Sequence, residues 1–454
     1  MANFAANKDN NNNNNNNNNM VSGPCIRGVR GILAVTKIGR KDAIGQPNNE
    51  EPKYEYDGND IKVGKILGQG GFGCVAECTF RRRARRGRRI IHIRLAVKSL
   101  KEPSQTTEIN NRNGDTNKSL DDEEQEQQKR QYERAVESLV REIRFLKLLQ
   151  PHPHIVRFVG ASSPDLDRPF LIMERLEETS HDRIKKWTQD QSKSLIDPSS
   201  LWNDRLTAAL GVAEGLRFMY EERGIVHRDI KPGNVGFDSN GTPKIFDLGL
   251  AKKLMDDHDT YRVGKSLVVG SVPYMAPEMA RGEQHHDPSK ADVYSFGMML
   301  WEMFALQGRP FWNYEKDEWI EYVVNGHHRP MCGHIQYPVA LSMLFDLVEQ
   351  FLHSCWHMDP DHRPSWDEVV CGLDKLQCYV QHELHQQVSE VLIHHDTHQL
   401  HESIISQVAR GQQIQDRRKS FVLKRILTKA WKRGRRVVGF GPQEGRDAVS
   451  GADR

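Results

Sequence analysis

Three polar residues that could act together lie within six positions of the segment IVHRDIKPGN, namely Asp229, Lys231 and Asn234. The aspartate could accept the proton of a hydroxyl group, and the lysine could balance the charge on a transferred phosphoryl group. The asparagine offers a side-chain oxygen, which is the type of ligand that a hard cation such as magnesium prefers. Taken alone, the segment has a simpler alternative, a capped turn with incidental charges.

A further carboxylate follows a short apolar run in KIFDLGLAK, where Asp247 stands two residues before Gly249. Placed near Asn234, it would give a divalent cation a second oxygen ligand. Two oxygen ligands beside a basic residue suit the phosphates of a nucleotide.

A glycine-rich segment, LGQGGFGCVAEC, contains Gly68, Gly70, Gly73 and Val75. Glycine lets backbone amides come close to phosphate oxygens, because no side chain stands in the way. Such a pattern is weak evidence by itself, since many glycine-rich hairpins are only turns.

Lys98 in LAVKSL lies on the same strand face as Ala96, opposite the face of Leu95 and Val97. Glu142 lies beside the apolar stripe of a helical pattern, where an unpaired carboxylate would be costly. We therefore expect an ion pair between Lys98 and Glu142. The alternative is that Lys98 is an ordinary surface lysine.

The elements around these residues change in type along the chain. From residue 61 to 100 the alternation predicts three antiparallel strands, with an exposed arginine-rich hairpin at 81–89. A polar insert at 101–130 then precedes one helix that packs on the sheet. After Met173 helical patterns dominate, so the expected fold class is α+β. We also expect Glu278 and Arg363 to form a buried structural pair.

Composition predicts an ordered centre with loose flanks in this chain of 454 residues. Hydrophobic residues make up 37% and charged residues 28%, and the formal net charge of +3 is too small to identify a partner. Residues 1–53 are asparagine-rich and predict a disordered tail. Seven scattered cysteines without paired spacing favour reduced thiols. With neither a signal sequence nor a transmembrane segment in the pattern, we expect a cytoplasmic or nuclear protein.

In their order along the chain, GxGxxGxV, AVK, the helix glutamate, HRDxKxxN, DLG and APE resemble the signature of the eukaryotic protein kinases. The resemblance implies a bilobal fold with a small antiparallel-sheet N-lobe at 54–173, which carries one packed helix, and a larger helical C-lobe at 177–380. It also implies an enzyme that transfers the γ-phosphoryl group of ATP to protein hydroxyl groups.

The resemblance gives each matching residue a role. Asp229 is implied as the catalytic base, Lys231 as its charge-balancing partner, and Lys98 as the phosphate ligand that Glu142 holds in place. Magnesium would be bound by Asn234 and Asp247. The residues implied to bind ATP are Leu67, Gly68, Gly70, Gly73, Val75, Ala96, Lys98, Met173, Glu174 and Leu176.

The serine/threonine class is resembled by two features, Lys231 shortly after Asp229 and the pair Gly270 and Ser271 before APE. The segment DVYSFGMMLWEM resembles the tyrosine-kinase-like branch. Arg228 before Asp229 implies activation by phosphorylation of the activation segment, at Thr260, Tyr261 or Ser266. Ser271 is expected instead to position Asp229 and Lys231, and Asp292 to anchor the loop that carries them. A pseudokinase scaffold and a small-molecule phosphotransferase are the rival interpretations.

Two positions depart from the family pattern. Leu248 stands where phenylalanine is usual, in a predicted apolar stack with Leu146, Phe158 and His227. Gly236 stands where an apolar side chain usually lies beneath adenine, so we expect weak ATP binding that Gly236→Leu would tighten.

Beyond the kinase-like region, the sequence predicts an amphipathic helical extension at 381–415, a basic amphipathic helix at 416–440 and a flexible end at 441–454. Residues 417–436 contain ten basic residues and no acidic ones. Such a helix can bind an anionic membrane surface or a calmodulin-like protein, and nucleic acid is a weaker option. The alternative is packing on the kinase domain.

Overall fold

The computed structural model describes residues 33–35, 54–56, 61–69, 73–83, 90–100, 118–162, 169–193, 197–254, 270–283 and 287–392. These residues divide into two units. The first comprises the chain up to Ile143 together with Phe158–Arg175, and the second comprises Arg144–Arg157 and the chain from Leu176 onward.

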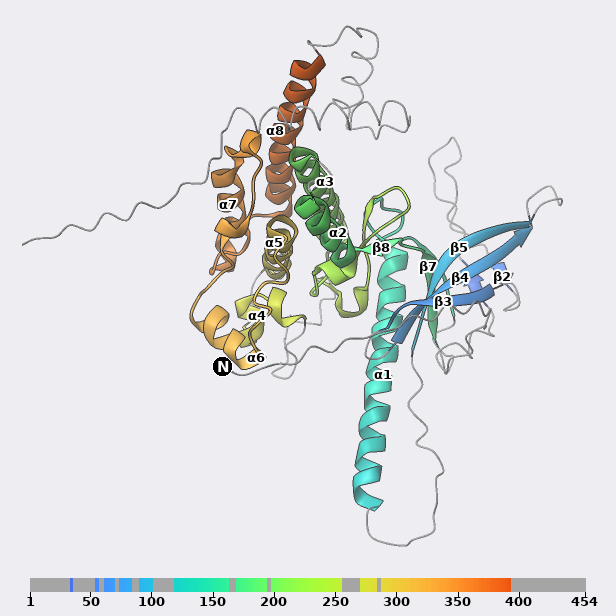
Figure 1. The fold of residues 1–454 in the computed structure, drawn as a ribbon. Helices are drawn as coiled ribbons and strands as arrows, with labels where there is room; N and C mark the ends of the chain where they lie inside the picture. The colour runs from blue at the N-terminus through green and yellow to red at the C-terminus, as the bar shows by residue number, and fades with distance from the viewer. Residues whose placement is uncertain are drawn as a thin grey trace, which may run out of the picture. The chain divides into compact units, whose positions relative to one another are not determined.

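An antiparallel sheet forms most of the first unit, with the strand order β2-β1-β6-β7-β5-β4-β3 (Figure 1). Its strands are β1 (Leu33–Val35), β2 (Tyr54–Tyr56), β3 (Ile61–Gln69), β4 (Gly73–Arg83), β5 (Ile90–Leu100), β6 (Phe158–Ala161) and β7 (Phe170–Glu174). Alternate side chains on one face form its core, which contains Ala76, Cys78, Leu95, Val97, Phe170 and Ile172.

The helix α1 (Lys118–Leu148) lies between β5 and β6 in sequence. It buries Leu139, Ile143 and Leu146 at helical spacing, which belong to the apolar stripe that the sequence predicts, and it buries Ala135 as well. The helix begins within the predicted polar insert, so part of that insert is helical.

Helices dominate the second unit (Figure 1). They are α2 (Ser180–Lys193), α3 (Pro198–Arg217), α4 (Pro277–Arg281), α5 (Ser289–Ala305), α6 (Lys316–Trp319), α7 (Leu344–Cys355) and α8 (Trp366–Leu392). Nearly every residue of α5 is buried, as expected for a helix at the centre of a helical unit. The helices α3 and α8 pack together, and Gln377 donates a hydrogen bond to Thr207 across this contact.

The second unit also contains short paired strands. The strand β10 (Val235–Phe237) pairs with β11 (Pro243–Ile245) and β8 (Glu178–Thr179), while β9 (Ile225–Val226) pairs with β12 (Lys252–Lys253). The expected α+β kinase-like fold, a small antiparallel sheet unit and a larger helical unit, is thus confirmed.

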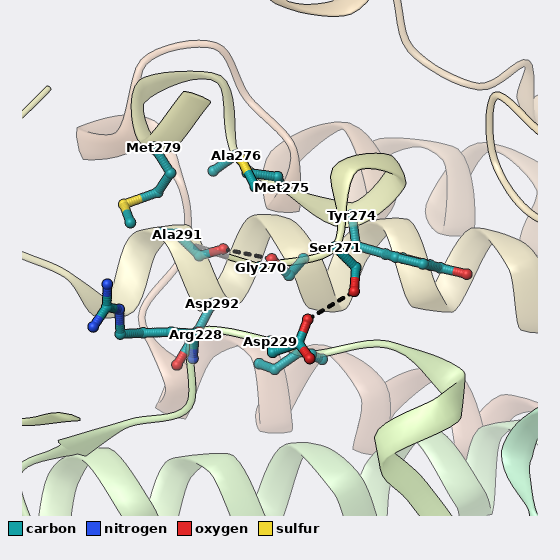
Figure 2. Close-up of a pocket in the computed structure, with 12 residues that line it drawn as sticks. Arg228, Asp229, Gly270, Ser271, Tyr274, Met275, Ala276, Met279, Ala291 and Asp292 are labelled. Atoms are coloured by element: carbon teal, nitrogen blue, oxygen red, sulfur yellow. Dashed lines mark hydrogen bonds between the residues drawn. The ribbon is translucent and has the colours of Figure 1, made fainter. Parts of the chain in front are cut away.

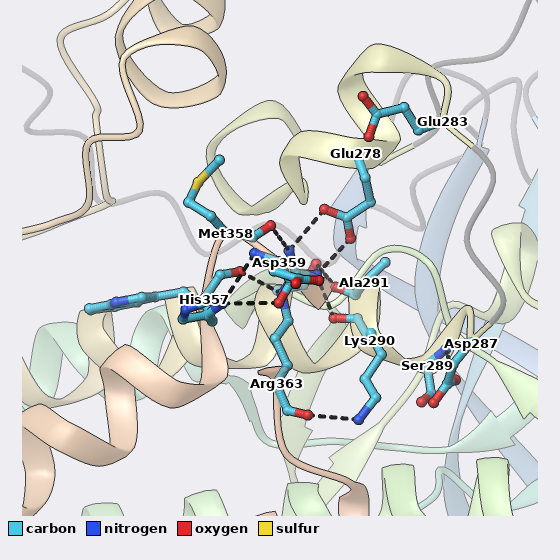
Figure 3. Close-up of polar contacts among 12 residues, drawn as sticks. Glu278, Glu283, Asp287, Ser289, Lys290, Ala291, His357, Met358, Asp359 and Arg363 are labelled. Atoms are coloured by element: carbon cyan, nitrogen blue, oxygen red, sulfur yellow. Dashed lines mark hydrogen bonds and ion pairs between the residues drawn. The ribbon is translucent and has the colours of Figure 1, made fainter. Parts of the chain in front are cut away.

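The predicted pair of Glu278 and Arg363 is present and buried (Figure 3). The two guanidinium nitrogens Nη1 and Nη2 of Arg363 lie 2.6 and 2.9 Å from the carboxylate oxygens of Glu278. The same guanidinium donates to the carbonyls of His357 and Lys290 at 2.8 and 2.9 Å. Such complete hydrogen bonding is what a buried ion pair requires. It joins α4 to the loop before α8.

Several predictions of chain organisation concern residues outside this description. The tail at 1–53 is described only at β1, and the hairpin at 81–89 only at Arg81–Arg83. The basic helix at 416–440 and the end at 441–454 lie outside the described residues, as does the extension beyond Leu392. Its first part continues α8 without a break at residue 380. Among the described helices, none has the length and apolar character needed to cross a membrane.

We predict that Glu278→Gln lowers the free energy of unfolding by about 3–5 kcal/mol, because the Arg363 guanidinium would stay buried without a counter-charge. Urea denaturation would measure the change. The double variant Glu278→Leu with Arg363→Met should recover part of this loss.

The matched control is Asp367→Asn, which breaks an exposed pair with Arg217. Exposed pairs contribute about 0–1 kcal/mol. A loss for Glu278→Gln as small as that for Asp367→Asn would contradict a structural role of the buried pair.

Candidate active site

The expected ion pair of the sheet unit is present. Lys98 Nζ on β5 lies 2.6 Å from a carboxylate oxygen of Glu142 on α1. The Glu142 side chain is 1% exposed, whereas that of Lys98 is 22% exposed. A buried carboxylate of this kind needs a cation, and the lysine meets the need while its ammonium group stays partly accessible.

The predicted phosphate-binding residues lie on the β3–β4 hairpin. Gly68 on β3 pairs with Val75 on β4, and Gly70 falls outside the described residues. At Gly73 an added Cβ would lie 2.8 Å from the Ser99 carbonyl oxygen, so the strands approach too closely there for a side chain. Leu67 lies next to this pairing on β3 and is exposed.

Ala96 and Met173, two of the predicted ATP-binding residues, are paired across β5 and β7. Both are buried in the sheet unit. Glu174 ends β7, and Leu176 belongs to the helical unit. The structure therefore places Ala96, Met173 and Glu174 on paired strands of the sheet unit, and Leu176 in the segment that follows β7.

Three side chains of the helical unit form a closed hydrogen-bonded set, called here the polar triad: Asp229, Lys231 and Ser271. Figure 2 shows the contact between Asp229 and Ser271. Lys231 Nζ lies 2.6 Å from Asp229 Oδ2 and 2.7 Å from Ser271 Oγ. The Ser271 hydroxyl donates to Asp229 Oδ1 at 2.9 Å. Both carboxylate oxygens of Asp229 are thus held in fixed directions, as the sequence led us to expect.

Asn234 is tied to the same aspartate. Its side-chain amide nitrogen lies 2.8 Å from both the backbone carbonyl and Oδ2 of Asp229. The amide nitrogen is therefore committed to Asp229, and the side-chain oxygen is the atom left to bind a cation.

The β10–β11 hairpin brings the two predicted metal ligands to one end. Asn234 precedes β10 and Asp247 follows β11, and the first pair of the hairpin is Val235 with Ile245. Asp247 adopts a left-handed backbone with φ 63°. A carboxylate and an amide oxygen at the same end of a hairpin fit the oxygen-donor set that magnesium takes.

Asp292, in the first turn of α5, accepts two backbone hydrogen bonds from the loop before Asp229. The amides of His227 and Arg228 donate to its two carboxylate oxygens at 2.6 and 2.8 Å. Burial raises the pKa of Asp292, and these amides oppose that rise. Arg228 has a positive φ of 69°, a strained conformation for a residue with a side chain. Asp292 therefore holds the loop in a conformation that it would otherwise avoid.

The predicted apolar stack is buried at every position, including Leu248 in place of phenylalanine. His227, Leu146 and Leu248 are buried in the helical unit, and Phe158 is buried in the sheet unit. Leucine at this position is therefore compatible with a buried site.

Gly236 is not the vacant position that the sequence suggested. A Cβ built there would lie 2.6 Å from Leu176 Cδ1 and 3.0 Å from the Glu178 carbonyl oxygen. Leu176 supplies apolar surface directly over the glycine, so a leucine at 236 would first have to displace it. The reason for expecting tighter ATP binding by Gly236→Leu does not apply in this structure.

A small cavity of about 20 Å³ beside the polar triad was not foreseen (Figure 2). Its lining includes Gly270, Tyr274, Met275 and Met279 in addition to Asp229. Tyr274 is fixed by a hydrogen bond of 2.5 Å to the buried Glu302. The mainly apolar run VPYMAPEM, which leads into α4, is the signal that could have identified this lining.

We predict that Asp292→Asn lowers the free energy of unfolding by about 1–3 kcal/mol, because an amide accepts only one of the two backbone hydrogen bonds. Hydrogen exchange at the amides of His227 and Arg228 should become faster. Urea denaturation and amide exchange would measure both effects. Asp374→Asn, on the exposed face of α8, is the control, and equal effects of the two variants would contradict the anchoring role.

Comparison with known proteins gives a family match and several relatives. The family model described as protein kinase domain matches residues 61–372. A probable serine/threonine-protein kinase SIS8 of Arabidopsis thaliana is 32% identical over 246 residues, which are 54% of this chain and 21% of that protein. The cytoplasmic tyrosine-protein kinase BMX of Homo sapiens is 28% identical over 228 residues, which are 50% of this chain and 30% of that protein.

Ephrin type-A receptor 8 of Homo sapiens is 30% identical over 230 residues, which are 50% of this chain and 20% of that receptor. The chain thus spans about a fifth to a third of the length of these relatives. Relatives named for serine/threonine and for tyrosine specificity both occur among them. Since the family model covers well over half of its residues, the chain belongs to the protein kinase domain family.

Proposed function

We propose that this chain is a serine/threonine protein kinase that transfers the γ-phosphoryl group of ATP to protein hydroxyl groups. The polar triad is the observation that carries the proposal. Asp229 is held by Lys231 and Ser271 with both carboxylate oxygens directed, which suits a group that receives the proton of an attacking hydroxyl.

Lys231 supports the serine/threonine choice. Its ammonium group bridges Asp229 and Ser271, so the pattern that resembles the serine/threonine class also forms one connected unit in space. In phosphoryl transfer the protein contributes mainly positioning and electrostatic stabilisation. A cation beside the catalytic carboxylate would balance the charge of the transferred group.

ATP and magnesium are the cofactors that this proposal requires. Asn234 and Asp247 would hold the metal through oxygen atoms, and Lys98, fixed by Glu142, would contact the phosphates. Magnesium, when bound, neutralises the phosphate charge that develops during transfer. The chain's own part is to fix these donors and to keep Asp229 oriented. A cytoplasmic or nuclear location belongs to the same proposal.

We also propose that phosphorylation of the activation segment raises the activity. In the described part of the chain, Arg228 Nε is buried without a hydrogen-bond partner. Figure 2 shows its guanidinium pointing away from Asp229. A buried guanidinium donor that lacks a partner is a natural ligand for a phosphate, and Thr260, Tyr261 and Ser266 are the candidate sites.

We predict that Asp229→Asn lowers the rate of phosphate transfer from labelled ATP at least about 100-fold, because the general base is lost. The assay uses a generic basic protein as acceptor, with magnesium, and identifies the phosphorylated amino acid. Label on serine and threonine is the expected result.

Asp374→Asn, an exposed substitution on α8, should retain wild-type activity. Label on tyrosine alone would overturn the serine/threonine assignment. No transfer by the wild type, even after phosphorylation of residues 255–269, would favour a scaffold without catalysis.

For regulation, we predict that alanine at the modified residue among Thr260, Tyr261 and Ser266 lowers activity at least about tenfold. Arg228→Ala should lower it as well, and the double variant should lose no more than the stronger single variant, since one contact is removed in each case. Mass spectrometry of the active protein identifies the residue. Full activity of protein that carries no phosphate on residues 250–270 would contradict the proposal.

A further inference from the structure

Three side chains with metal-binding atoms meet on the helical unit, among residues that the proposed phosphoryl transfer does not use. They are Cys332, Glu349 and His353, and one ligand atom of each lies within 4.8 Å of the other two. Cys332 opens a short 3-10 helix (Cys332–His334), while Glu349 and His353 stand one turn apart on α7. Positions i and i+4 of a helix share one face, so α7 presents two ligands toward a third.

Backbone hydrogen bonds hold the segment that carries Cys332, and the other two side chains of the cluster can be reached from solvent. Cys332 is 4% exposed, and its carbonyl accepts a hydrogen bond from Ile335 at 2.9 Å. The preceding carbonyl, of Met331, accepts from the indole of the buried Trp301 at 3.1 Å. The side chains of His353 and Glu349 are 55% and 37% exposed, which leaves an entry path from solvent.

The distances suit a tetrahedral ion after a small movement. Bond lengths of about 2.0–2.3 Å to zinc imply ligand atoms roughly 3.3–3.8 Å apart, about 1 to 1.5 Å closer than the present upper limit of 4.8 Å. Glu349 and His353 are exposed enough to make this adjustment by rotating their side chains. Cys332 can stay where it is.

The chemistry of the set points to zinc rather than to magnesium. A thiol and an imidazole are poor ligands for magnesium but good ligands for zinc. Burial and the neighbouring Glu349 carboxylate raise the pKa of the Cys332 thiol to about 11. A metal ion must therefore displace the thiol proton, and it would in turn remove the repulsion between thiolate and carboxylate.

Tyr337 provides an independent sign that a polar group is expected here. Within the described residues its hydroxyl oxygen is buried without a hydrogen-bond partner. Burial is the main cause that raises the pKa of this hydroxyl, and the charges of Cys332 and Glu349 add to the rise, so the hydroxyl is within electrostatic reach of the cluster. A water molecule as fourth zinc ligand would give the hydroxyl the partner that it lacks.

One existing contact opposes metal binding. Trp356 donates to His353 Nδ1 at 3.4 Å, which places the proton of the neutral imidazole on Nε2, 4.0 Å from Glu349. Metal binding at Nε2 would move that proton to Nδ1 and end the contact. A bond of this length is weak, so its loss costs little beside a metal–nitrogen bond.

We propose that Cys332, Glu349 and His353 form a zinc-binding site, with water as the fourth ligand, that ties the 3-10 helix Cys332–His334 to α7. The metal is a structural brace on the helical unit. It is separate from the predicted magnesium ligands Asn234 and Asp247, which are oxygen donors that flank the β10–β11 hairpin.

The test uses the full-length, reduced, chelator-treated protein titrated with zinc, and separately with cobalt as a spectroscopic substitute. We expect the wild type to bind one more equivalent of zinc than the double variant Cys332→Ser with His353→Gln. Each single change, Glu349→Gln included, should weaken this equivalent roughly tenfold or more. A thiolate–cobalt absorption band should vanish in Cys332→Ser, and zinc should raise the melting temperature of the wild type but not that of the double variant.

The chain has 20 histidines and seven cysteines, so the controls are Cys371→Ser and His382→Gln on exposed positions of α8. Both should keep the equivalent and the cobalt band. If Cys332→Ser fails to fold, Glu349→Gln and His353→Gln decide, because their side chains are partly exposed on α7. Equal zinc stoichiometry and affinity in the wild type and in these variants would overturn the proposal.

Discussion

The buried carboxylate of Asp292 is the constraint on which the candidate active site depends. It accepts the amides of His227 and Arg228, and it thereby holds the strained backbone that turns Asp229 toward Lys231 and Ser271. A single buried acceptor on the first turn of α5 thus fixes the direction of a side chain on another segment. Lys231, Ser271 and Asn234 all contact Asp229, so their arrangement follows the direction of that side chain.

Residues whose partners are set by charge were predictable from sequence. The pair Lys98–Glu142 follows from the cost of burying one charge alone, whereas Glu278–Arg363 was expected because an acid and a base in such turns can pair, and both pairs are present. The sheet and the helical unit followed from periodicity, because alternation and helical spacing reflect which face is buried. The start of α1 did not follow from periodicity, because its first turns carry polar side chains that fit either a solvated helix or a loop.

Features that depend on packing between distant segments could not be read from the sequence. Gly236 looked like a missing apolar residue because its neighbour Leu176 is remote in sequence, and only the fold shows that Leu176 fills the space. The convergence of Cys332 with Glu349 and His353 has the same origin. Spacing within one helix was visible, but the cysteine comes from a separate loop whose path depends on Trp301 and Ile335.

The bidentate contact of Arg363 with Glu278 also has a consequence for synthesis of the chain. The two residues are 85 positions apart, so the carboxylate leaves the ribosome long before the guanidinium exists. At translation rates of about 5–20 residues per second, that interval is roughly 4 to 17 s. During it, Glu278 on α4 lacks the guanidinium that neutralises it in the folded chain. Vectorial synthesis thus makes this part of the helical unit a late addition, completed only when nearly the whole domain has been made.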